Sequence, residues 1–113
     1  MYTDSHTHLY LDAFKDDRKA MIQRAIESGV TRMFLPNIDS HTIEAMFRLA
    51  DHFPNHCFPM MALHPTSVKE DYRDQLAIIE QHLGDKRIVA IGESGIDLYW
   101  DTTYIKEQEE VFR

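Results

Sequence analysis

The sequence has little cysteine, glycine, proline or positive charge, and each shortage excludes a class of protein. The single cysteine, Cys57, excludes a disulfide framework within the chain. Its place in the apolar run 57–63 predicts a buried strand thiol in a reducing compartment. With only four glycines and four prolines, the 113 residues contain no low-complexity linker. A net charge of −7 argues against a broad basic groove for nucleic acid, although bound divalent cations can supply local positive charge.

The sequence also lacks targeting and membrane features. Residues 1–6 have neither a basic region nor an apolar core, so no signal peptide is expected. No apolar run approaches the length of a membrane span. We therefore expect a cytoplasmic protein that does not associate with a membrane.

Four apolar, β-prone runs recur along the chain at intervals of about 30 residues, the usual size of a strand–helix unit. These predicted strands are Met1–His6, Val30–Pro36, Cys57–Leu63 and Ile88–Glu93. Helical patterns lie between them, and another helix is expected from about residue 103. Strands that alternate with helices predict a parallel sheet. The sheet would be either open and doubly wound or an arc of a (βα)₈ barrel.

Each predicted helix carries apolar residues at helical spacing. The three predicted stripes are Phe14, Met21, Ile22, Ala25 and Ile26; Ile43, Met46, Phe47 and Ala50; and Tyr72, Leu76, Ile79 and Leu83. An open flavodoxin-like sheet would place a glycine-rich loop after the first strand, but residues 6–12 contain no glycine, which favours the barrel.

The carboxyl-terminal segment predicts that the sequence is incomplete. Ile105 and Phe112 begin an apolar face, and no helix stop signal follows them. We expect the chain to continue in the full protein, or to be a truncated product. Residues 1–113 would then be the N-terminal part of a single barrel domain. Because half a barrel exposes two strand edges, the chain alone is expected to be poorly folded or self-associating, and inactive.

The first chemical signal is the segment Asp4–His8. If the first strand continues through it, Asp4, His6 and His8 project from the same face of the strand. Two imidazoles at this spacing can bind one divalent ion, and Asp4 could hold one ring in its metal-binding tautomer. The ends of strands in a βα series commonly carry such sites.

Two later strand ends add polar residues. His64 precedes Pro65 at the end of the third predicted strand and is interpreted as a substrate or phosphate contact. Glu93 ends an apolar strand between two glycines, where a carboxylate is costly unless it is paired or bound to metal. Asp97 follows and could orient a ligand or a water. Tyr99 and Trp100 could stack on a base, although packing within the loop is the simpler interpretation.

The remaining histidines are expected to be surface or hydrogen-bonded residues without a role in the site. They are His41, His52, His56 and His82.

These segments together resemble the TatD family of metal-dependent deoxyribonucleases. Asp4–Leu9 is similar to the family's first motif, which also suits other metal-dependent hydrolases. Ala62–Pro65 is similar to its His-Pro segment, and Ala90–Tyr99 to its most distinctive signature. Gln108 and Phe112 sit as in the helix that follows in the family. Ala62 and Ser94 depart from the family pattern without removing a ligand.

The resemblance implies a TIM-barrel hydrolase of which this chain supplies about the first four βα units. It further implies two divalent ions, of Mg, Mn or Zn, with His6 and His8 on the first ion and a catalytic Glu93 bridging both. Two further histidines and an aspartate of the family pattern would lie outside this sequence. The implied reaction is metal-assisted hydrolysis of DNA, from the 3′ end and with single strands favoured, without a stable protein partner. The alternatives are a metal-dependent phosphoesterase acting on small substrates and a truncated, non-catalytic binding or assembly module.

Overall fold

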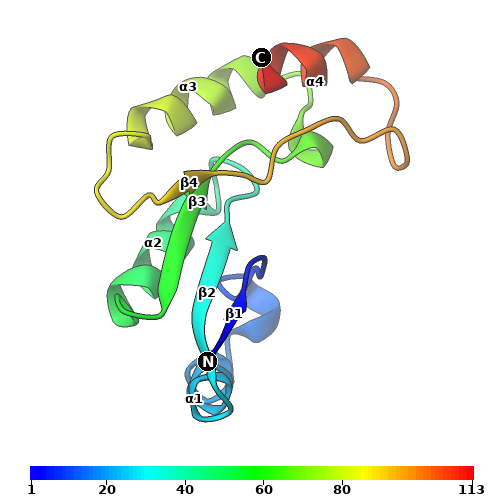
Figure 1. Ribbon diagram of the computed structural model, residues 1–113. Helices are drawn as coiled ribbons and strands as arrows, with labels where there is room; N and C mark the ends of the chain where they lie inside the picture. Colours follow the sequence, from blue (N-terminus) through cyan, green and yellow to red (C-terminus); the bar gives the residue numbers. More distant parts are fainter.

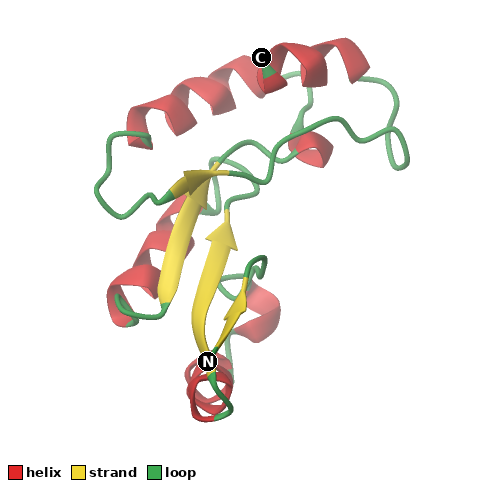
Figure 2. Cartoon of the chain, viewed as in Figure 1, coloured by secondary structure: helices red, strands yellow, loops and turns green.

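The computed structural model describes residues 1–113, in which strands and helices alternate (Figure 1, Figure 2). The strands are β1 (Tyr2–Asp4), β2 (Val30–Pro36), β3 (Cys57–Met61) and β4 (Ala90–Ile91). The α-helices are α1 (Arg18–Glu27), α2 (Ile43–His52), α3 (Tyr72–His82) and α4 (Ile105–Phe112). Two short 3-10 helices, η1 (Asp12–Phe14) and η2 (Pro65–Ser67), precede α1 and α3. The strands are all parallel and lie in the order β1-β2-β3-β4, which confirms the predicted sheet.

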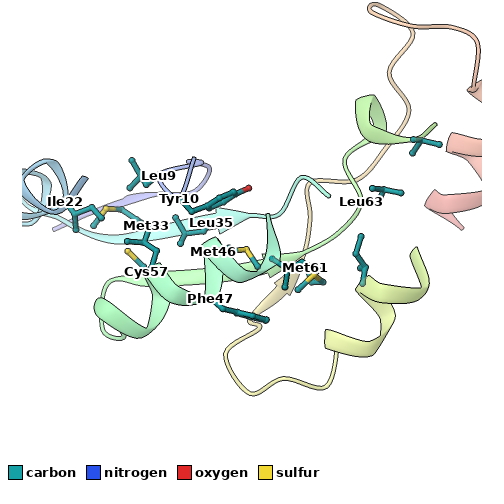
Figure 3. Close-up of a cluster of buried hydrophobic side chains, with 14 of the residues drawn as sticks. Leu9, Tyr10, Ile22, Met33, Leu35, Met46, Phe47, Cys57, Met61 and Leu63 are labelled. Carbon is teal, nitrogen blue, oxygen red and sulfur yellow. The ribbon is translucent and has the colours of Figure 1, made fainter. Parts of the chain in front are cut away.

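One face of the sheet forms the hydrophobic core with the helices that follow β1 and β2. Met33 and Leu35 of β2 and Cys57 and Met61 of β3 are buried on this face (Figure 3). The helix α1 packs against β2, and α2 packs against β3. Each large apolar side chain buried in this way contributes about 1.5–3 kcal/mol to folding. The core therefore holds the carboxyl ends of β2 and β3 together at one edge of the molecule.

The apolar stripe predicted for the second helix is confirmed. Ile43, Met46, Phe47 and Ala50 of α2 are all buried. The first stripe is correct only in part, because Phe14 lies in η1 and Ile22 alone of α1 is buried.

The third stripe reaches less far than predicted. Tyr72 and Ile79 are buried, whereas Leu83 at the end of α3 is 43% exposed. The Tyr72 hydroxyl donates to Glu110 Oε2 at 2.8 Å, which ties α3 to α4. The packing of these two helices depends partly on polar contacts between residues far apart in the sequence.

Two strands are shorter at their carboxyl ends than predicted. The first strand ends at Asp4 and not at His6, because the His6 backbone N–H bonds to Asp4 Oδ1 instead of to the neighbouring strand. The third strand ends at Met61, although Ala62 and Leu63 are buried as expected.

The fourth strand also differs from the prediction Ile88–Glu93, since β4 contains only Ala90 and Ile91. The strand ends at Ile91 and is followed by Gly92, whose φ of +153° is rarely adopted by other residues. A Cβ at Gly92 would approach Met60 Cε to 2.9 Å. As the edge strand, β4 is exposed, with Ile91 63% accessible. The prediction that Glu93 ends a buried strand was therefore wrong.

The structure bears on two predictions made from composition, the buried cysteine and the lack of a membrane-spanning segment. Cys57 is a free, buried thiol, and burial raises its pKa to about 12. Among the helices, not one combines the length and apolar character needed to span a bilayer.

Candidate metal centre

Three donor groups from distant parts of the sequence meet beyond the carboxyl ends of the strands. His6 and His8 lie in the coil after β1, and Glu93 lies in the loop after β4. One ligand atom from each residue lies within 4.8 Å of the other two. The parallel order β1-β2-β3-β4 requires the sheet to curve for its first and last strands to bring these groups together. The structure therefore brings together the three residues that the sequence analysis grouped as metal ligands.

The spacing of the donor atoms fits a divalent transition metal. His6 Nε2 lies 3.2 Å from His8 Nε2 and 2.9 Å from Glu93 Oε2, and His8 Nε2 lies 3.5 Å from Glu93 Oε2. Ligands bound at about 2.0–2.1 Å in a tetrahedral arrangement are separated by about 3.3 Å. Two imidazoles and a carboxylate are also donors that zinc and manganese accept. The residues present therefore fit a metal ion.

The hydrogen bonds around His8 assign its tautomer. The buried Tyr10 hydroxyl donates to the Pro36 carbonyl oxygen. Its oxygen is then the acceptor for the His8 Nδ1–H, 3.0 Å away. The proton on Nδ1 leaves the Nε2 lone pair of His8 directed at the cluster. Burial raises the pKa of the Tyr10 hydroxyl well above its usual range, so the hydroxyl keeps the proton that it donates.

Tyr10 was missed by the sequence-based reasoning. It continues the spacing of two residues that relates Asp4, His6 and His8, and that continuation is the signal that could have found it. Burial lowers the pKa of His8, and the neighbouring His6 acts in the same direction, whereas Glu93 opposes it. The ring is thereby favoured in its neutral, metal-binding form.

His64 joins the same cluster through the other carboxylate oxygen. Its Nδ1 accepts a hydrogen bond from the Thr66 backbone N–H at 3.1 Å, which places the proton of the neutral ring on Nε2. That Nε2–H lies 3.1 Å from Glu93 Oε1. Glu93 thus has Oε1 on His64 and Oε2 facing His6 and His8.

Asp4 and Asp97 have contacts different from those expected. Asp4 Oδ1 accepts from the His6 backbone N–H at 3.1 Å, so it contacts the main chain and not an imidazole. Asp97 Oδ1 accepts from the backbone N–H groups of Tyr99 and Trp100 at 2.7 and 3.2 Å. Both carboxylates shape the backbone beside the cluster, because each is engaged by N–H groups of its own loop.

The other four histidines lie outside the cluster, as expected. His41 and His52 are exposed, His82 is half-buried, and His56 Nδ1 bonds to the Thr31 carbonyl oxygen at 2.7 Å.

The largest hollow of the molecule, about 370 Å³, lies between the start of α1 and α2 and contains none of the donor residues. Arg18 at its rim donates to the carbonyl oxygens of Leu9, Tyr10 and Leu11. We therefore place the chemistry at the donor cluster and not in this hollow.

Comparisons with known proteins show which proteins the chain is similar to. The chain is 29% identical over 113 residues to the uncharacterized metal-dependent hydrolase YabD of Bacillus subtilis, covering 100% of this chain and 44% of that protein. It is 29% identical over 109 residues to the 3′-5′ ssDNA/RNA exonuclease TatD of Dickeya dadantii, covering 96% of this chain and 41% of the relative. The chain therefore spans less than half the length of these relatives.

A solved structure is similar in fold as well. The crystal structure of YjjV, a TatD homologue from Escherichia coli K12, matches with a TM-score of 0.87 and 26% identity. The match covers 98% of this chain and 43% of that one. The four parallel strands and their helices thus form half of a TIM barrel, its N-terminal part, which confirms the predicted architecture. The model of the TatD related DNase family matches residues 3–113, and the chain belongs to that family.

Proposed function

We propose that the complete protein is a metal-dependent phosphodiesterase that hydrolyses DNA, with single strands cut from the 3′ end. The observation that carries this proposal is the cluster of His6, His8 and Glu93, whose donor atoms have the separations of ligands around one divalent ion. The relative named a 3′-5′ ssDNA/RNA exonuclease supports the substrate class.

Each residue of the cluster has a distinct task in this proposal. His6 and His8 supply Nε2 atoms, and Tyr10 holds the His8 ring in the required tautomer. Glu93 supplies Oε2 and is the catalytic carboxylate. A bound divalent ion would supply a water of lowered pKa and neutralise charge on the phosphoryl oxygens.

His64 acts in the proposal as a positioning residue, because its Nε2–H holds Glu93 Oε1. Glu93 would also help to hold the second ion implied by the family resemblance, together with donors outside this chain. We therefore assign one ion to the donors of this chain, and two ions of Mg, Mn or Zn to the complete enzyme. A phosphate contact for His64 stays a prediction, as does a direct role for Asp4 or Asp97 in binding.

The test is a nuclease assay of the complete protein with Mg²⁺, Mn²⁺ or Zn²⁺ and a single-stranded DNA labelled at its 5′ end. We expect a ladder of products shortened stepwise from the 3′ end, and no such ladder after Glu93→Ala. His82→Ala is the matched control, because it removes a half-buried imidazole on α3 that lies outside the donor cluster. A fully active Glu93→Ala enzyme would refute the assignment.

The net charge of −7 favours a second candidate, a metal-dependent phosphoesterase that acts on small substrates. A phosphomonoester such as p-nitrophenyl phosphate needs no extended basic groove. Faster turnover of this ester than of single-stranded DNA would support the second candidate. Failure to hydrolyse either substrate, with no bound metal, would instead support the non-catalytic binding module.

A further inference from the structure

The loop between β4 and α4 presents two aromatic side chains to solvent. Tyr99 is 81% exposed and Trp100 is 76% exposed. The loop extends away from the sheet before the chain returns to α4 (orange in Figure 1). Packing within the loop, the simpler interpretation from sequence, does not account for rings this accessible. Exposed aromatic rings of this size are typical of binding surfaces.

Hydrogen bonds fix the loop beneath these rings. Asp97 Oδ1 accepts from the backbone N–H groups of both aromatic residues. The buried side chain of Gln108 on α4 holds the Asp97 backbone twice, accepting from its N–H at 2.7 Å and donating to its carbonyl oxygen at 3.3 Å. The aromatic pair is therefore anchored to a helix, which lowers the conformational entropy lost when a ligand binds.

The two rings form a corner. Their centroids are 4.8 Å apart and their planes meet at 89°. A flat ligand that stacks on the face of one ring meets the other ring at a right angle. Nucleobases are flat and have a π-face whatever their identity, so they suit such a corner without sequence selection.

The acidic side chains of the loop already have hydrogen-bond or ion-pair partners, which reduces their repulsion of a nucleic-acid strand. The Asp97 carboxylate is engaged by backbone N–H groups, as described above. Asp101 Oδ2 pairs with Lys69 Nζ at 2.8 Å, and its Oδ1 accepts from the Thr103 N–H. Of the two acidic residues of this loop, Asp101 is thus paired with a cation and Asp97 is hydrogen-bonded to the main chain, although the chain carries a net charge of −7.

The pair is within reach of the candidate metal centre. Tyr99 lies six positions after Glu93, so their Cα atoms are at most about 22 Å apart. A nucleic-acid strand whose end lies at Glu93 can therefore reach the pair within a few nucleotides.

We propose that Tyr99 and Trp100 form a stacking platform for the unpaired bases of single-stranded DNA or RNA, a few nucleotides from the bond that is cut. This inference rests on the proposed nuclease function and deepens it. It makes the aromatic corner, and not a basic groove, the element that selects single strands, because bases inside a duplex are already stacked.

Trp100 makes the proposal directly measurable, since it is the only tryptophan of this chain. Where the complete protein contains other tryptophans, they are replaced by phenylalanine. The metal-loaded protein is titrated with a short thymidine oligonucleotide carrying hydrolysis-resistant phosphorothioate linkages. We expect saturable quenching of Trp100 fluorescence, and about tenfold weaker binding after Tyr99→Leu. Tyr2→Leu is the matched control, because Tyr2 is a 70% exposed tyrosine on β1.

Two further ligands separate stacking from phosphate binding. A duplex of the same sequence, and an abasic oligonucleotide with the same number of phosphates, should each leave the Trp100 fluorescence unchanged. Equal binding of the abasic and thymidine oligonucleotides, with no effect of Tyr99→Leu, would overturn the platform.

The outcome is distinguishable from failure of the nuclease proposal. Glu93→Ala, which removes a metal donor, should hydrolyse nothing and bind the oligonucleotide more weakly, but it should still show saturable quenching of Trp100. Hydrolysis of single-stranded DNA without quenching of Trp100 would refute the stacking platform and support the nuclease function. Quenching of Trp100 in a protein that hydrolyses no substrate would support the stacking platform and refute the nuclease function.

Discussion

His64 Nε2 lies 3.1 Å from Glu93 Oε1, and this contact leaves Glu93 Oε2 directed at His6 and His8. The carboxylate is therefore oriented before any ion binds. We expect His64→Ala to lower the affinity for Zn²⁺ or Mn²⁺ by a factor of about 10–100, because partners of metal ligands contribute that much. Isothermal titration calorimetry measures the change. His64→Gln keeps a side-chain N–H donor and should recover part of the affinity, and an unchanged affinity in His64→Ala would contradict the assigned role.

Tyr10→Phe should weaken both the fold and the metal centre. The substitution keeps the buried ring but removes the hydroxyl between His8 Nδ1 and the Pro36 carbonyl oxygen. We expect a loss of about 1 kcal/mol in the free energy of unfolding, measured with urea, because a buried acceptor loses its donor. Metal affinity should fall as well. Tyr2→Phe, at an exposed tyrosine, is the control and should change neither quantity.

Metal binding should stabilise the complete protein against heat. An ion that binds only the folded state adds about 2.7 kcal/mol when its concentration is 100 times its dissociation constant. Adding Zn²⁺ or Mn²⁺ should therefore raise the midpoint of thermal unfolding, and a chelator should reverse the change. His6→Ala should abolish the shift, whereas His82→Ala should retain it. An equal shift in both variants would place the ion elsewhere.

Acid should destabilise the chain in part through Asp85. Hydrogen bonds from Arg87 lower the pKa of Asp85 to about 2, compared with about 3.9 in an unfolded chain. Because the folded pKa is the lower one, the stabilisation is complete above about pH 4 and is lost as the pH falls toward 2. The midpoint of urea unfolding, followed with pH, should be higher in the unmodified chain than in Asp85→Asn at neutral pH. The two curves should converge in acid, and parallel curves would contradict the prediction.

The sequence by itself determined the repeating architecture and which residues form the candidate metal centre. The α2 stripe of Ile43, Met46, Phe47 and Ala50 was predictable because helical spacing is a local property. His6, His8 and Glu93 were predictable because parallel strands place their carboxyl ends at one edge. Asp4 and Asp97 each bond to nearby backbone N–H groups, which their spacing in the sequence did not indicate, and a direct role for either in binding stays a prediction.

Only the tertiary structure decided how the donors are oriented. The Tyr10 hydroxyl meets a carbonyl oxygen 26 residues away, and His64 meets Glu93 across the sheet edge. The spacing of residues in the sequence does not reveal such pairs, because their geometry depends on how the strands curve and where each strand ends. The short β4 pairs with β3 only at Met60 and Met61, a length that its apolar sequence did not indicate. Local spacing thus specifies which residues face the site, while packing between distant segments decides which atoms of those residues meet.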